Sequence, residues 1–117
     1  MLTQLKELYT LNKLIRYFHF NTDSGFLHEA ADYIKFAGML DTLTEVLIQT
    51  GQVDKRKLLH LESEQNVSDS KLFLIEEIER VTSSVVSEVA DFRAVNKVLD
   101  DISEFLSILQ YKLENLS

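Results

Sequence analysis

An unbroken heptad repeat of apolar residues runs from Leu74 to Leu116, with gaps of three and four positions throughout. Its members are Leu74, Ile78, Val81, Val85, Glu88, Phe92, Val95, Leu99, Ile102, Leu106, Leu109, Leu113 and Leu116. Glu88 is the one polar member of the set. This spacing is typical of a helix whose apolar stripe faces another helix. The second half of the chain is therefore predicted to be helical, with a face that must be covered.

The repeat predicts one long helix over about 70–116, because no glycine or proline follows Gly51. A straight helix of that length would extend about 70 Å, whereas a compact chain of this size has a radius of gyration of about 13–14 Å. Such a helix either pairs with another subunit or folds back. A break near 82–84 is the alternative, since hydroxyl and β-branched residues there lower helix propensity. The unbroken phase favours continuity, most firmly over 84–116.

Further apolar residues lie beside the heptad stripe, among them Ile75, Val98 and Phe105. A stripe this wide suits a bundle of four or more helices, in which each helix contacts two neighbours. We therefore expect a homodimer whose bundle includes the C-terminal heptads. The predicted dimer seam consists of Val85, Phe92, Val95, Leu99, Ile102, Leu106, Leu109 and Leu113.

Three more helices are predicted in the first half, over about 2–20, 25–50 and 55–64, from apolar residues at gaps of three and four. The chain has no proline and only three glycines, too little turn chemistry for a β-rich fold. Gly51 stands where a helix-ending residue of positive φ belongs, and Gly38 suggests a close helix crossing. The fold class is all-α, a helical bundle forming one domain over 1–117.

The charge is acidic and unevenly distributed. The net charge is −7, and residues 59–117 carry twelve acidic and five basic side chains. Such a surface disfavours non-specific binding to nucleic acid or anionic lipid.

The chain has no cysteine, which favours a reducing compartment. Its longest apolar runs are four residues, and charged residues interrupt the first twenty, so we expect a cytoplasmic protein without membrane association.

Aromatic residues are concentrated early in the chain, with seven of the eleven between residues 9 and 36. Such a cluster is most often part of a core or a subunit contact. If Tyr17, Phe20 and Tyr33 are exposed together, a site for a partner protein is the better interpretation, because aromatic residues are enriched at interface hot spots.

The segment from about 40 to 64 has the outline of a helix-turn-helix, with a turn at Gly51 and a short helix opening on Lys55, Arg56 and Lys57. Cations at the start of a recognition helix contact phosphates and guanine edges in the major groove. The alternative function is therefore a DNA-binding transcriptional regulator. A solvated cationic turn explains the same residues.

No catalytic or metal-binding set is recognisable. His28 and Asp32 are one helical turn apart, but the second histidine and further ligand of a zinc site are missing. His19 and His60 follow Arg16 and Arg56 at spacings too short for a helical nuclease motif. We therefore predict no enzyme activity, cofactor or metal. The sequence favours a small acidic interaction or regulatory protein that binds a protein partner, which it does not identify.

Overall fold

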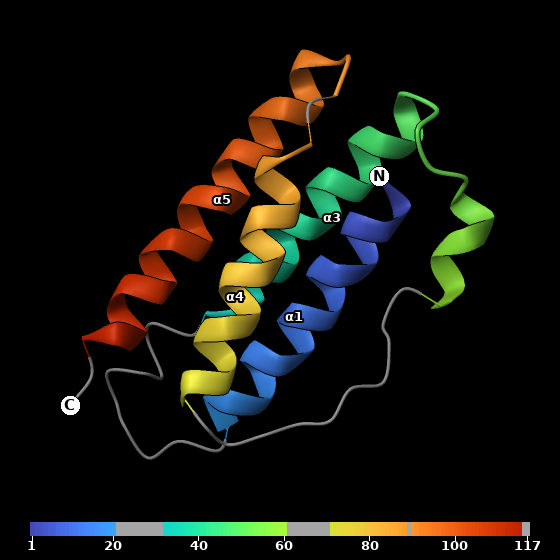
Figure 1. Cartoon of the computed structure of the whole chain (residues 1–117). Coiled ribbons are helices and arrows are strands. Elements are labelled where there is room, and N and C mark those ends of the chain that lie inside the picture. The colour runs from blue at the N-terminus through green and yellow to red at the C-terminus, as the bar shows by residue number, and fades with distance from the viewer. Residues whose placement is uncertain (21–31, 61–70, 89, 116–117) are drawn as a thin grey trace.

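The computed structural model describes residues 1–20, 32–60, 71–88 and 90–115. Over these residues the chain forms four α-helices, one short 3-10 helix and no strand, so the predicted all-α fold is confirmed. The elements are α1 (Leu2–Phe20), α3 (Tyr33–Gln49), the 3-10 helix η1 (Lys55–His60), α4 (Lys71–Val86) and α5 (Arg93–Glu114) (Figure 1).

The four α-helices form an antiparallel bundle. Helix α1 packs beside α3, α3 beside α5, α5 beside α4, and α4 beside α1. Neighbours run in opposite directions around this square, and η1 lies outside it (Figure 1). The described fold measures 44 × 25 × 21 Å. Helices α3 and α4 occupy diagonal corners of this arrangement, whereas α4 and α5 are adjacent both in sequence and in space.

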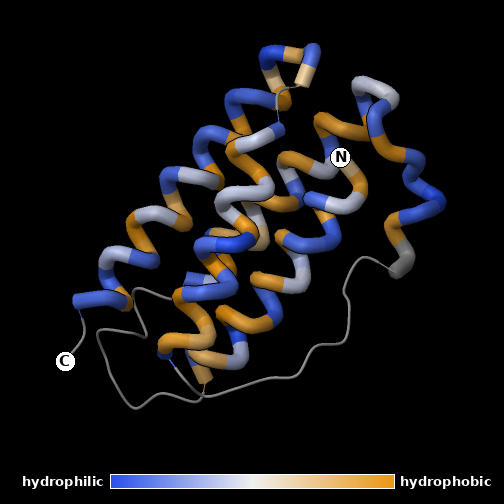
Figure 2. The backbone as a smooth tube through the Cα atoms, viewed as in Figure 1, coloured by the Kyte–Doolittle hydropathy of each residue, from blue (hydrophilic) through white to orange (hydrophobic). Residues whose placement is uncertain are grey.

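Apolar stripes from all four helices meet along the bundle axis, and polar residues lie on the outer sides (Figure 2). The stripes recur at three- and four-residue gaps, as predicted for amphipathic helices. The side chains that are at most 1% exposed include Leu5, Leu8, Leu11 and Ile15 of α1, Phe36, Leu40, Leu43 and Leu47 of α3, Ile78, Val81 and Val85 of α4, and Val95, Ile102, Leu106, Leu109 and Leu113 of α5.

The prediction of one helix from 70 to 116 is wrong, and so is the narrower prediction of one helix over 84–116. Helix α4 ends at Val86 and α5 begins at Arg93. The chain folds back a few residues after the alternative position at 82–84. Residues 82–84 stay helical because their flanking valines, Val81 and Val85, are both buried in the core. Folding back lets a single chain bury both stripes.

The predicted dimer seam closes within the chain. Seven of its eight residues are at most 3% exposed in the chain's own core, and only Phe92 is exposed, at 44%. These seven side chains therefore have no face left for a second subunit in this conformation. The interruption at Glu88 lies in the connection between α4 and α5, where its Oε1 accepts a hydrogen bond of 2.8 Å from Gln4 Nε2.

The two described glycines differ in backbone conformation. Gly51 has φ +72° and follows the end of α3, as predicted. Gly38 is exposed, and a Cβ added there would meet nothing within 4 Å. The predicted close helix crossing at Gly38 is therefore wrong, because the helix turns this position to solvent.

The helices predicted over 25–50 and 55–64 agree in part with the structure. Helix α3 begins at Tyr33, and the start predicted near residue 25 lies outside the described residues. The helix predicted over 55–64 is a 3-10 helix over Lys55–His60 in its described part.

Candidate interaction site

An aromatic and cationic cluster lies where the end of α1 meets the start of α3. The rings of Phe20 and Tyr33 are 5.6 Å apart between centroids. The Arg16 guanidinium carbon lies 5.9 Å from the Phe20 centroid and 5.7 Å from that of Tyr33, within cation–π range. The imidazole of His19 packs edge-on against both rings, at 5.1 and 5.0 Å. We call Arg16, His19, Phe20 and Tyr33 the aromatic cluster.

Helix geometry builds this cluster from two short segments. Arg16 and Phe20 are four residues apart, which places them on one face of α1. Asp32 caps α3, since its Oδ1 accepts a hydrogen bond of 2.9 Å from Lys35 N, and this cap makes Tyr33 the first helical residue. The antiparallel packing of α1 and α3 then brings Tyr33 against the last turn of α1.

The three aromatics predicted as a partner site are therefore partly brought together. Phe20 and Tyr33 are in contact, with Phe20 62% exposed and Tyr33 half-buried. Tyr17 is 38% exposed and lies three residues before Phe20 on α1. The sequence analysis did not indicate the roles of Arg16 and His19. The i, i+4 spacing of Arg16 and Phe20 does predict that these two side chains lie on one face of α1.

A concave feature that the sequence did not predict lies between α3 and α5. It is a groove of about 430 Å³. Phe105 lines the groove, and its ring stacks on that of the buried Phe36, 5.2 Å away and nearly parallel. Lys35 Nζ lies 6.0 Å from the Phe105 centroid. Its walls come from segments about 70 residues apart, so no local pattern indicates it. The lining residues are Asp32, Lys35, Met39, Asp101, Glu104, Phe105, Ile108, Leu109 and Lys112.

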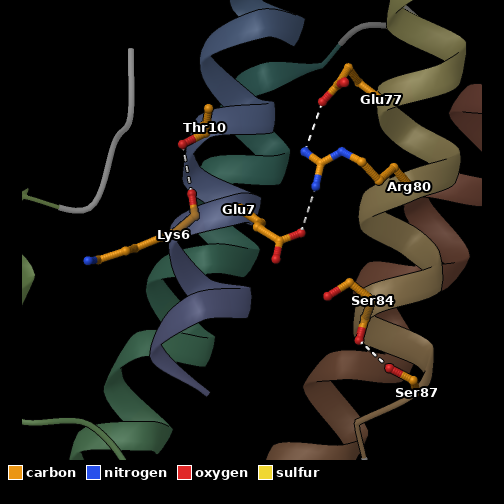
Figure 3. A network of polar contacts seen from close by, with 7 residues as sticks. All are labelled: Lys6, Glu7, Thr10, Glu77, Arg80, Ser84 and Ser87. Carbon is orange, nitrogen blue, oxygen red and sulfur yellow. Dashed lines mark hydrogen bonds and ion pairs between the residues drawn. The ribbon is translucent and has the colours of Figure 1, made fainter. Parts of the chain in front are cut away.

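The seam between α1 and α4 is closed by a polar bridge (Figure 3). Arg80 Nη1 lies 3.1 Å from Glu7 Oε2 of α1, and Arg80 Nη2 lies 2.9 Å from Glu77 Oε2 of α4. The hydrogen bond to Glu77 is the main cause of a raised Arg80 pKa, with Glu7 adding to it.

Tyr9 joins α1 to α3. Its hydroxyl donates to Asp41 Oδ1 at 2.9 Å and shares a hydrogen bond of 2.9 Å with Thr44 Oγ1. Burial raises the pKa of Tyr9 to about 12, and the Asp41 carboxylate contributes to the same shift. This anchor fixes the register of α1 against α3, and with it the position of the aromatic cluster.

The three predicted nucleic-acid contacts, Lys55, Arg56 and Lys57, are exposed. Arg56 is paired with Asp54 at 2.9 Å, and this pairing lowers the Asp54 pKa. These cations lie on a six-residue 3-10 helix, not on an α-helix of the length that reads a major groove. DNA binding through 40–64 stays a prediction that no observed contact favours.

The histidines do not form a described site together. His19 belongs to the aromatic cluster, whereas His28 and the side chain of His60 lie outside the described residues. In the described part of the chain, no three histidine or acidic side chains are close enough to hold a metal ion.

None of the described helices combines the length and hydropathy that crossing a membrane requires.

Comparison with known proteins adds no relative. No protein-family model, curated protein or solved structure matches this chain.

Proposed function

We propose that this chain is a non-enzymatic interaction protein that binds a partner protein through the aromatic cluster, with Tyr17 and Lys13 at its margin. The observation that carries the proposal is the Phe20 ring. It is 62% exposed, yet it packs against both the Tyr33 ring and the Arg16 guanidinium. Tyrosine, tryptophan and arginine dominate binding hot spots, and a side chain already held in place loses less entropy on binding.

The charge around Phe20 indicates the partner's chemistry. Arg16 of the cluster and Lys13, one turn earlier on α1, are both exposed, while Glu7 of the same helix is engaged by Arg80. Lys13 and Arg16 therefore place two exposed positive charges near Phe20, on a chain whose net charge is −7. The complementary partner presents an acidic segment with an apolar side chain that packs on Phe20, and complementary charge favours its approach in this orientation.

A photo-crosslinking amino acid at position 20 tests the proposal in the source cell. Position 72 is the matched control, because Leu72 of α4 is exposed to the same extent, 62%. A partner captured from position 20 and not from position 72 is then purified for binding measurements. Equal capture from both positions contradicts the proposal.

Titration of the purified partner separates a hot spot from incidental proximity. We expect Phe20→Ala to weaken binding by about thirtyfold, as a hot-spot truncation of about 2 kcal/mol does. Arg16→Glu should weaken it by at least as much, and Leu72→Ala should leave it unchanged. Retained affinity in both Phe20→Ala and Arg16→Glu, with folding verified by circular dichroism, contradicts the proposed site.

A further inference from the structure

The buried residues of α4 and α5 share one heptad register, although a turn separates the two helices. Counting from Leu74 in alternating steps of four and three reaches the core positions of α4, passes Glu88 and Phe92, and continues onto the core positions of α5. A helical hairpin needs no such agreement, because each helix meets the core independently. A continuous helix does need it, because only then do both stripes lie along one face.

The turn itself carries few of the residues that enforce a break. The connection from Ser87 to Phe92 contains no glycine or proline. Phe92 is the N-cap of α5 and makes no side-chain capping hydrogen bond, and phenylalanine is a poor residue for that position. The apolar side chains flanking the turn are also poorly covered, since Val86 is 62% and Phe92 44% exposed.

A straightened α4–α5 could not be covered by its own chain. From Lys71 to Glu114 it would span 44 residues and about 66 Å, against a longest dimension of 44 Å for the described fold. The stripe of α5 would leave its own bundle and require an equivalent site elsewhere. A second copy of this chain that opens in the same way offers that site between its own α3 and α4.

We propose that this chain forms an exchanged homodimer, in which the 87–92 turn straightens and each copy inserts its α5 into the bundle of the other. Two long helices then run antiparallel across the dimer. The shared register keeps both bundles on the same side of each long helix. This exchange is independent of the proposed partner binding, because α1 and α3 stay together in each copy.

Few interactions distinguish the two states, because the core contacts of α5 are re-formed between copies. The closed turn is held by Asn96, whose side chain accepts from Ala90 N at 2.9 Å and donates to Ala90 O at 2.8 Å, and by the bond from Gln4 to Glu88. Straightening loses these bonds and brings Phe92 into the apolar stripe of the continuous helix. The balance therefore depends on the turn residues and on protein concentration.

Position 93 offers a variant that blocks exchange. Arg93 is the first residue of α5, where proline is well tolerated, and Phe92 before it is extended (φ −107°, ψ 124°). In a straight helix the same proline would be internal and cost about 3 kcal/mol. We expect Arg93→Pro to stay monomeric and to weaken the dimer about a hundredfold per exchanged helix. Arg93→Ala, which loses the same charge, should dimerise like the unaltered chain.

The double variant Glu88→Leu/Asn96→Ala favours the dimer. It makes the heptad fully apolar and removes all three hydrogen bonds that brace the turn. Sedimentation after refolding at high protein concentration should show a dimer dissociation constant lower by about tenfold or more. A double variant that remains monomeric at every concentration would overturn the proposal.

A distance measurement identifies exchange among other kinds of dimer. The chain has no cysteine, so Leu72→Cys and Tyr111→Cys place spin labels at two exposed sites near the same end of the bundle. Their separation within one chain is short when the turn is closed and about 58 Å when the helix is straight. The spin-labelled chain should also carry Glu88→Leu and Asn96→Ala, and it is diluted in an excess of unlabelled Glu88→Leu/Asn96→Ala protein. This sample should give the long distance. A dimer that retains the short distance contradicts exchange.

Discussion

The ends of α3 and α4 show two ways to stop a helix. After α3, Gly51 adopts φ +72°, Gly51 N donates to Ile48 O at 3.1 Å, and Gln52 N donates to Leu47 O at 2.9 Å, the Schellman arrangement. After α4, the described residues all keep negative φ, and the Ser87 hydroxyl donates to Ser84 O at 2.8 Å (Figure 3). The end of α3 depends on the backbone conformation of a glycine, whereas the end of α4 depends on side-chain hydrogen bonds and on packing in the core.

This difference separates a turn that is fixed by its glycine from a turn that, as we propose, can also straighten. At Gly51 the backbone occupies a region that L side chains rarely adopt, and the paired carbonyls of α3 are satisfied only in that geometry. At 87–92 every residue type is compatible with a helix, so the closed form depends on how the rest of the molecule is arranged. Five predictions, from the largest expected effect to the smallest, test this contrast.

The largest effect is expected beneath the first turn. Leu47 is fully buried, and its carbonyl oxygen accepts hydrogen bonds from Gln52 N and Val53 N. Leu47→Ala should lower the free energy of unfolding by about 2–5 kcal/mol, through lost burial and a cavity. Urea denaturation checks this value. A loss below 1 kcal/mol would mean that the end of α3 is not firmly packed.

Gly51→Ala tests the first turn directly. A Cβ at φ +72° is strained although the space around it is open. We expect a loss of about 1–2 kcal/mol in urea denaturation. An unchanged stability would show that this turn is not fixed by its glycine, and the contrast with the second turn would fail.

Asn96→Ala is the matching change at the second turn. It removes two hydrogen bonds to Ala90 but leaves the core of α5 intact. We expect the monomer to lose about 1 kcal/mol in denaturation at low protein concentration, less than two ordinary bonds because alanine favours the helix. A loss of 3 kcal/mol or more would show that the second turn is as firmly held as the first.

Gly38→Ala provides the control for glycine itself. Gly38 is in the middle of α3, is exposed, and has no neighbour that a Cβ would meet. Alanine should therefore raise the free energy of unfolding by up to about 1 kcal/mol. The free energy of unfolding should rise for Gly38→Ala and fall for Gly51→Ala. This contrast would show that the backbone conformation of Gly51, and not the replacement of a glycine as such, causes the loss. A destabilised Gly38→Ala would contradict the structure of α3.

The titration of Tyr9 tests the packing of α1 against α3, the helix that ends at the first turn. We expect no change in stability from this residue near neutral pH. Its folded pKa is raised to about 12 from an ordinary value of 10.0. The neutral phenol is the favoured folded form, so this contribution to stability is complete below about pH 10 and is lost as the pH rises towards 12. Carbon-13 NMR of labelled tyrosine should show one resonance titrating near 12, which is missing in Tyr9→Phe. A Tyr9 resonance that titrates near 10 would contradict its buried hydrogen bonds.

Much of the fold could be predicted from residue pattern alone. The bounds of α1 were predicted as 2–20, the end of α3 within a residue, and the role of Gly51 correctly, because periodicity and positive φ are local properties. The turn between α4 and α5 could not be placed, since Val81 and Val85 keep the suspected break helical by their burial. Seven of the eight predicted seam residues are buried, but in the described structure it is the same chain that covers them.

The candidate site was predicted in the same partial way. Tyr17, Phe20 and Tyr33 were identified from the concentration of aromatic residues, whereas Arg16 and the groove between α3 and α5 depend on which helices become neighbours. The groove joins Lys35 to Phe105, and no pattern in the sequence relates positions so far apart.

The sequence by itself determined which faces of the helices are apolar, where Gly51 ends α3, and that one heptad register extends from Leu74 through α5. The tertiary structure alone decided what covers that register. A heptad specifies a face that must be buried, and it does not specify whether the same chain or another buries it. In the closed form, α5 packs against α3 and α4 of its own chain because the turn at 87–92 is short enough to bring it there.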